Sequence, residues 1–203
     1  MLTDKTLRFI IKPLVFALCL VPLALLIWWG FTDNLGANPI EKSNRFLGDW
    51  ALRFLLIALA VTPLRILTNW AGAIRFRRML GLFAFAYVVL HLTSYVVLDQ
   101  FFDWSAIWKD IIKRWYITVG MTGVVLLLPL AITSTKGWIK RIGGKAWQKL
   151  HKLVYPAAIL GVFHFYMMLK SDFREPLLYA VILSILFGIR LYDANRKRKP
   201  RTA

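Results

Sequence analysis

Residues 79–98 read MLGLFAFAYVVLHLTSYVVL, an apolar run of twenty residues that contains one histidine, His91. A helix needs about 20 apolar residues to cross the hydrocarbon core of a bilayer. An ionisable side chain inside such a helix is costly unless it has a partner, so by default it marks a functional site. This stretch therefore predicts a membrane-spanning helix with a site inside it.

Five further apolar stretches have the length of a membrane span or come close to it. They are residues 14–31, 50–67, 117–133, 153–169 and 177–192. The composition agrees, because 59% of the 203 residues are hydrophobic and 15% are aromatic. We therefore expect an all-α integral membrane bundle of six transmembrane helices. Nothing indicates a second domain, so we expect one transmembrane domain over residues 1–203.

The basic residues favour one side of this bundle. Nineteen of the 27 Lys and Arg residues lie in the N-terminal segment, the second and fourth connections and the C-terminal segment. Seven lie in the other three connections, which also hold eight of the ten acidic residues, and Arg53 belongs to neither group. Because basic connections stay in the cytoplasm, both termini are expected there. The net charge of +17 thus indicates topology rather than a nucleic-acid partner.

One predicted outer connection, residues 101–115, has helical periodicity of its own. Its apolar residues at this spacing are Trp104, Ile107, Trp108, Ile111 and Ile112. The pattern predicts a short helix that lies in the outer interface of the membrane. Such a helix can serve as a lid on the membrane surface or as a docking platform for a periplasmic partner.

Two of the three histidines lie at matched depth. His91 is seven residues before the end of the third predicted span, and His164 is five residues before the end of the fifth. At about 1.5 Å per residue, both sit roughly 8–10 Å inside the outer boundary. Two imidazoles at one depth can clamp one iron from opposite sides, which is the geometry of a bis-histidine b-type haem. This haem would transfer electrons without binding substrate, because both axial positions are filled.

The third histidine, His151, lies thirteen residues before His164, at the predicted cytoplasmic edge. It can belong to an inner haem or redox site, or it can be an interfacial histidine bonded to backbone or headgroup. The matching position before His91 is Arg78, so a second bis-histidine haem cannot be built by the same pattern. An ideal helix places His151 and His164 about 140° apart, although Pro156 between them can alter the register.

Basic residues surround the predicted inner site. Arg77 and Arg78 precede the third span, and the segment 140–145, which contains two glycines, precedes His151. Such groups can hold a flavin phosphate or a haem propionate. The topology signal alone also explains these charges.

Several other classes of protein are disfavoured. Cys19 is the only cysteine, so neither an intrachain disulfide nor a CxxC metal site is possible. No dinucleotide-binding or Walker motif is present. A proton-relay transporter would be expected to carry acidic residues inside its spans, and the six predicted spans have none in their interiors. A non-redox anchor would not require two histidines at one depth. Because no dinucleotide-binding motif is present, the electrons are expected to come from a quinol or from a separate protein.

Several segments resemble the MsrQ (YedZ) family in order and spacing over nearly the whole chain. They are residues 35–39, 62–65, 77–82, 90–95, 133–135 and 147–155. This family is the haem-binding membrane subunit of the bacterial periplasmic methionine-sulfoxide reductase system. It belongs to the ferric-reductase-like transmembrane superfamily.

The resemblance implies a flavocytochrome of the bacterial inner membrane with heme b and FMN. The implied electron donor is the quinone pool or a cytoplasmic flavin reductase. The implied acceptor is a periplasmic molybdopterin-containing subunit that reduces methionine sulfoxide in oxidised proteins, so catalysis is expected in that partner. In the family pattern His91, His151 and His164 match the haem-associated histidines, and Arg78 occupies a fourth position that is histidine in relatives with fused reductase domains. The resemblance identifies no residue that contacts FMN.

Overall fold

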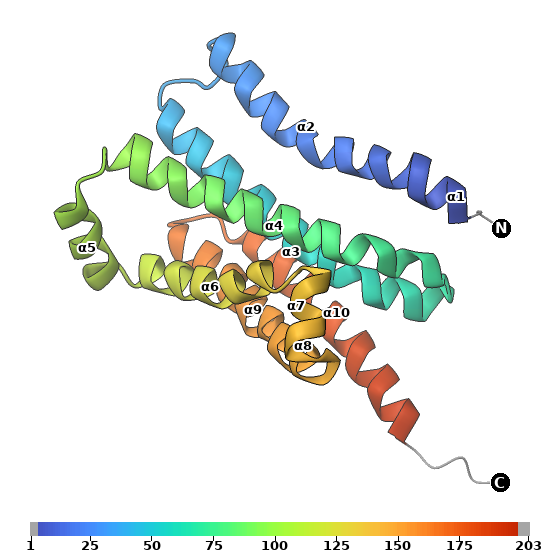
Figure 1. Ribbon diagram of the computed structural model, residues 1–203. Helices are drawn as coiled ribbons and strands as arrows, with labels where there is room; N and C mark the ends of the chain where they lie inside the picture. The colour runs from blue at the N-terminus through green and yellow to red at the C-terminus, as the bar shows by residue number, and fades with distance from the viewer. Residues whose placement is uncertain (1–3, 199–203) are drawn as a thin grey trace, which may run out of the picture.

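A computed structural model describes residues 4–198, and these residues form helices and short connections without any strand (Figure 1). The α-helices are α1 (Asp4–Thr6), α2 (Lys12–Phe31), α3 (Pro39–Thr68), α4 (Ile74–Ser94), α5 (Trp104–Lys113), α6 (Trp115–Ile132), α7 (Lys136–Ile142), α8 (Gly144–Leu150), α9 (Val154–Met168) and α10 (Arg174–Arg198). Short π-helical or 3-10 segments join or extend them: η1 (Leu7–Ile11), η2 (Ala71–Ala73), η3 (Tyr95–Asp99) and η4 (His151–Leu153). The all-α class is confirmed.

Five helical stretches are long and apolar enough to cross a membrane. They are Asp4–Phe31, Pro39–Thr68, Ala71–Asp99, Trp115–Ile132 and Arg174–Lys197. The remaining predicted span, residues 153–169, corresponds to α9, which has fifteen residues and is thus about 22 Å long. It is short because the chain before it folds into α8 and the turn η4 instead of extending the helix. Residues 199–203 of the basic C-terminal segment lie outside the described part.

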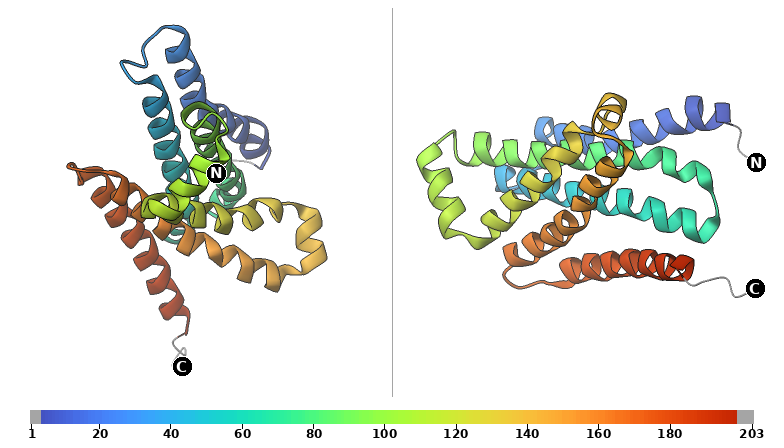
Figure 2. Two further views of the ribbon diagram at one scale, coloured as in Figure 1. Left: turned by 90° about the vertical axis from the view of Figure 1, so that its left-hand side faces the viewer. Right: turned by 60° about the horizontal axis from the view of Figure 1, so that its bottom comes forward.

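The helices around the candidate site form two pairs. α4 packs most extensively against α3, and α6 packs most extensively against α9. α10 packs on α3 and α9, while α2 lies along the outside of the α3–α4 pair (Figures 1 and 2). The chain thus presents two helical hairpins side by side, α3–α4 and α6–α9.

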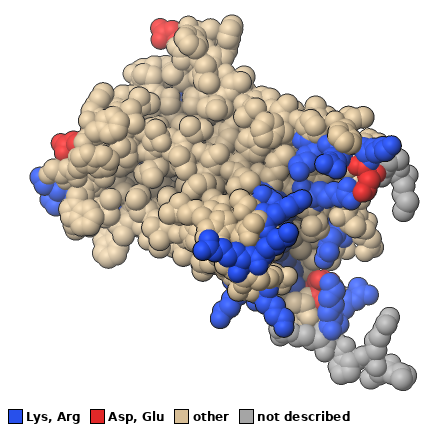
Figure 3. Space-filling view, viewed as in Figure 1, with Lys and Arg blue, Asp and Glu red and all other residues tan. Residues whose placement is uncertain are grey.

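The two ends of the bundle differ in charge. Lys and Arg side chains gather at the end that holds α1, α7, α8 and the last turns of α10 (Figure 3). We call this the basic end, and the end that holds α5 the α5 end. The described parts of the four segments that the charge count assigned to one side of the membrane lie toward the basic end (Figures 1 and 2).

Side-chain caps begin the two helices that frame the α5 end. Asn38 accepts a hydrogen bond from the backbone N–H of Glu41 (3.2 Å), and Pro39 follows as the first residue of α3. Asp103 accepts from the backbone N–H of Ala106 (2.9 Å) and begins α5. Such caps satisfy N–H groups that have no partner within the helix. The short helix predicted in the connection 101–115 is confirmed as α5.

A tyrosine from α4 repairs the backbone of α2 at Pro22. Proline lacks an N–H and disturbs the hydrogen bonds of the preceding turn. The Tyr87 hydroxyl donates to the Cys19 carbonyl (2.9 Å) and accepts from the Leu23 N–H (3.1 Å). Tyr87 is almost fully buried and lies one turn before His91. This contact therefore ties the helix that carries His91 to α2.

Arg190 has a similar role in α3. Pro63 leaves the Leu59 carbonyl without its helical donor, and Arg190 Nη2 donates to that carbonyl (2.6 Å). The guanidinium also donates to the Tyr155 hydroxyl (3.2 Å). The bonds at Pro22 and Pro63 show how neighbouring helices make proline tolerable within a bundle.

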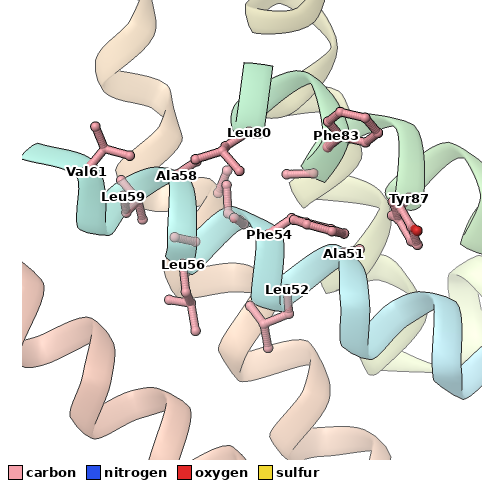
Figure 4. Close-up of a cluster of buried hydrophobic side chains, with 14 of the residues drawn as sticks. Ala51, Leu52, Phe54, Leu56, Ala58, Leu59, Val61, Leu80, Phe83 and Tyr87 are labelled. Carbon is pink, nitrogen blue, oxygen red and sulfur yellow. The ribbon is translucent and has the colours of Figure 1, made fainter. Parts of the chain in front are cut away.

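The apolar core is centred on α3 and α4. Phe54 packs against Tyr87 and Phe83, with ring centroids 5.0 and 6.0 Å apart. The cluster continues along both helices (Figure 4), where the labelled residues are Ala51, Leu52, Phe54, Leu56, Ala58, Leu59, Val61, Leu80, Phe83 and Tyr87. This packing fixes the register of α4, and hence of His91, against α3.

Candidate cofactor site

A cavity of about 620 Å³ lies between the two helical hairpins. Residues of α3, α4, α6 and α9 line it, including both His91 and His164. Its volume is within the range of about 300–1,000 Å³ that is typical of small-molecule and cofactor sites. Charged side chains from the α5 end also line it, among them Arg45, Asp49 and Arg114, so the cavity extends toward that end. Of the three histidines, only His151 is absent from this lining.

The imidazole of His91, on α4, is hydrogen-bonded to the neighbouring helix α3. Its Nδ1 atom is 2.9 Å from the Asn44 carbonyl oxygen of α3. Because a carbonyl only accepts, Nδ1 must carry the proton and Nε2 is left as a free lone-pair donor. The Asn44 side chain also reaches the α4 terminus, where its amide donates to Ser94 Oγ (2.9 Å). The Ser94 hydroxyl in turn donates to the His91 carbonyl (2.8 Å).

His164 has the same arrangement in the other hairpin. Its Nδ1 atom is 2.6 Å from the Tyr116 carbonyl oxygen of α6. The proton is again on Nδ1, which leaves Nε2 unprotonated. Tyr116 also packs against the imidazole with its ring centroid 6.1 Å away. Each hairpin therefore delivers one histidine whose tautomer is fixed by a peptide carbonyl of the partner helix.

The two imidazoles face a common space. Their ring centroids are 6.3 Å apart, and their planes meet at 74°. Both side chains are partly accessible, as expected of residues that line a cavity. Neutral imidazole with a free Nε2 is a common metal ligand, and ligating histidines usually donate their other N–H to a carbonyl or carboxylate. Two such groups can bind one metal centre from two sides.

The sequence reasoning missed two glycines beside these rings. A Cβ atom at Gly48 of α3 would lie 3.1 Å from His91 Cε1, and one at Gly120 of α6 would lie 2.9 Å from His164 Cε1. Each glycine follows the residue that supplies the carbonyl by four positions. Glycine within a helix costs roughly 0.5–1 kcal/mol relative to alanine. The sequence offered such a signal at Gly120, which lies inside the predicted span 117–133, but Gly48 precedes the predicted span 50–67.

His151 lies in different surroundings, in the turn η4 at the basic end. Its ring stacks on Trp147 at 3.8 Å between centroids. The carbonyls of Trp147 and Leu130 are near the ring, but neither ring nitrogen has a hydrogen bond of ordinary geometry within the described residues. Burial lowers the pKa of His151 below its usual 6.5, and the charge of Arg77 lowers it further. Its surroundings therefore favour the uncharged form of His151.

The two arginines predicted to contact a cofactor, Arg77 and Arg78, differ in exposure. Arg77 is partly buried and acts electrostatically on both His151 and Arg190. Arg78, by contrast, is exposed. The angle of 140° expected on an ideal helix does not apply, because His151 lies in a 3-10 turn before α9 begins. The structure therefore brings His91 and His164 together, places Arg77 near His151, and leaves Arg78 at the surface.

Comparisons with known proteins agree with this architecture. Residues 47–162 match the family described as "Ferric reductase like transmembrane component". This range contains both helical hairpins apart from the first turns of α3 and the end of α9. Together with the five long apolar helices, it shows a multi-pass membrane protein.

Curated relatives cover almost the whole chain. A protein of Rhodospirillum rubrum is 57% identical over 188 residues, which are 91% of this chain and 89% of the relative. A protein of Caulobacter vibrioides is 50% identical over 92% of this chain and 89% of the relative. One of Herminiimonas arsenicoxydans is 49% identical over 96% and 90%, respectively. All three are named "Protein-methionine-sulfoxide reductase heme-binding subunit MsrQ". The chain therefore belongs to the MsrQ family, within the ferric-reductase-like transmembrane proteins.

Proposed function

We propose that this chain is the electron-transfer subunit of a protein-methionine-sulfoxide reductase system, and that His91 and His164 hold one b-type haem between them. The observation that carries the proposal is the pair of imidazoles 6.3 Å apart, each with its Nδ1 proton held by a carbonyl. The curated relatives are named as heme-binding subunits, which supports the choice of cofactor.

The residues present fit a haem. The two imidazoles line one cavity with their centroids 6.3 Å apart, and each has its Nδ1 occupied by a carbonyl, so both Nε2 atoms are available to hold one group. The apolar residues of the cavity suit the porphyrin, while Arg45 and Arg114 at the α5 end can pair with its carboxylates.

The chain's own residues define what the site can do. A haem held there would supply one-electron redox chemistry. His91 and His164 would both be used to hold it, and the Asn44 and Tyr116 carbonyls would keep each Nε2 available for that role. Catalysis on methionine sulfoxide is thus assigned to a partner rather than to this chain.

We place the protein in the bacterial inner membrane with its basic end and both termini in the cytoplasm, because basic segments remain on that side. The whole chain, residues 1–203, would act as one ferric-reductase-like domain. Electrons would enter at the basic end from the quinone pool or a cytoplasmic flavin reductase. They would leave at the α5 end toward a periplasmic molybdopterin-containing reductase subunit, which repairs oxidised periplasmic proteins.

His151 is assigned to the entry side of this path. It lies at the basic end with Arg77, and its two ring nitrogens lack hydrogen-bond partners within the described residues. It can serve an inner haem or redox site. FMN is included on the family resemblance alone, with Arg77 and the segment 140–145, where α7 passes into α8, as groups that could hold its phosphate.

The deciding experiment is a visible spectrum of the purified protein and its three histidine-to-alanine variants, with haem measured per protein. We expect a low-spin haem spectrum that is lost in His91→Ala and in His164→Ala. The absence of such a spectrum in the wild-type protein would instead favour a membrane anchor or a proton-relay transporter subunit. A spectrum that survives removal of His91 or His164 would also overturn the proposed ligation.

A further inference from the structure

The two glycines beside the histidine rings occupy equivalent places in the two hairpins. In α3 the Asn44 carbonyl accepts a hydrogen bond from His91 Nδ1, and Gly48 lies one turn later. In α6 the Tyr116 carbonyl accepts a hydrogen bond from His164 Nδ1, and Gly120 lies one turn later. Residues four apart occupy the same face of a helix. In each hairpin, the glycine and the carbonyl therefore face the same imidazole.

The space beside each ring is too small for a side chain. A Cβ at Gly120 would lie 2.9 Å from both Cε1 and Nδ1 of His164. A Cβ at Gly48 would lie 3.1 Å from Cε1 and 3.2 Å from Nδ1 of His91. Carbon atoms in favourable contact are about 3.5–4.0 Å apart. An added methyl group would therefore have to push the ring away from its carbonyl or push the two helices apart.

Other glycines of the chain do not share this feature. A Cβ at Gly81 of α4, the helix that carries His91, meets no atom within 4 Å, and neither does one at Gly188 of α10. In those helices alanine would be the better helix former by about 1 kcal/mol. The close approach of glycine to imidazole is thus specific to the two helices that supply the carbonyls.

We propose that Gly48 and Gly120 are positioning residues, which let each imidazole lie against the partner helix so that its Nδ1–H reaches the carbonyl and its plane is fixed. This inference rests on the proposed haem ligation by His91 and His164. A carbonyl acceptor makes the ligating nitrogen more basic, and a more basic ligand favours the ferric state. The glycines therefore help to keep the midpoint potential of the bound haem low. They also set the 74° between the ring planes.

The test compares Gly48→Ala and Gly120→Ala with the matched control Gly81→Ala, each purified with its haem in detergent. Three quantities are measured: haem per protein, the midpoint potential, and the largest g value in the electron paramagnetic resonance spectrum of the oxidised protein. That g value reports the angle between the axial ring planes.

We expect Gly120→Ala to bind haem about 10–100-fold more weakly, as for loss of other groups that orient a metal ligand. The haem that remains should have a raised midpoint potential and a shifted g value. Gly48→Ala should change the midpoint potential and the g value in the same directions but by smaller amounts than Gly120→Ala, because its Cβ would have slightly more room. Gly81→Ala should match the wild-type protein in all three measurements.

Wild-type potential and g value in both Gly48→Ala and Gly120→Ala would overturn the inference, as would equal shifts in Gly81→Ala. If Gly120→Ala loses its helical circular dichroism, the milder Gly48→Ala decides the question by itself. Failure of the proposed function is distinguishable, because it would appear as the absence of a histidine-dependent haem spectrum in the wild-type protein.

Discussion

The surroundings of His91 and His164, inside the bundle toward the α5 end, differ from those of His151 at the basic end. His91 and His164 each have a carbonyl for Nδ1, a glycine that gives them room and a shared cavity for Nε2. His151 has a stacked tryptophan and a nearby arginine but no hydrogen bond at either nitrogen within the described residues. Ligating histidines usually have their second nitrogen occupied. The comparison indicates a preorganised site toward the α5 end and an incomplete one at the basic end.

The largest expected effect separates the two regions directly. His91→Ala should remove the low-spin haem, a greater loss than the roughly 10–100-fold that follows from losing an outer-shell partner. His151→Ala should keep that haem but slow its reduction from the basic end. Haem per protein and the rate of reduction by a reduced flavin are the measurements. Equal haem loss in both variants would erase the distinction between the two ends.

Tyr87→Phe tests how much the hydrogen bonds between α4, the helix that carries His91, and α2 contribute to stability. The change leaves the Cys19 carbonyl and the Leu23 N–H without their buried partner. We expect a loss of about 1–3 kcal/mol in the free energy of unfolding, measured by denaturation in detergent. Tyr166→Phe is the control, since Tyr166 is 44% exposed whereas Tyr87 is buried. Equal stability of the two variants would show that the backbone of α2 near Pro22 is not stabilised by Tyr87.

Trp147→Phe tests the basic end. Phenylalanine keeps an aromatic ring against His151 but loses the hydrogen bond from Trp147 Nε1 to the Thr133 carbonyl (2.9 Å). A net loss of about 0.5–1.5 kcal/mol is expected. The spectrum of the haem that we propose His91 and His164 hold should not change. A changed spectrum would mean that the two regions are coupled more tightly than their separate contacts suggest.

The smallest effect is expected at α5. Asp103→Ala removes the N-cap of this helix and should cost about 1 kcal/mol. Digestion by a protease added from the α5 end should become faster, while haem per protein stays constant. Lys109→Ala, on the exposed face of the same helix, provides the control. Loss of haem in Asp103→Ala would make α5 part of the cofactor site.

Sequence patterns predicted the elements that depend on local chemistry. The apolar runs located the long helices, because their length and composition are set by the bilayer. The periodicity of residues 101–115 predicted α5, and the equal depths of His91 and His164 predicted that they would lie close together. Each of these features follows from the composition and spacing of residues within individual segments of the chain.

Features that depend on two segments were not predictable in this way. The pairing of His91 with Asn44 and of His164 with Tyr116 requires the packing register of two helices, which single-chain periodicity does not contain. The depth argument also treated 153–169 as one helix starting near His151. In the structure His151 lies instead in the turn η4, before α9 begins, so helical spacing does not relate it to His164.

The two proton acceptors are main-chain atoms, and this has a consequence for how the protein tolerates change. Every amino acid brings a peptide oxygen, so replacements at positions 44 and 116 cannot delete the acceptor itself. Sequence drift at these two positions is therefore buffered, whereas a single added methyl group at position 48 or 120 would disturb the ring beside it. The protection covers the acceptor atoms alone, because the Asn44 side chain also donates to Ser94 and the Tyr116 ring also packs against His164.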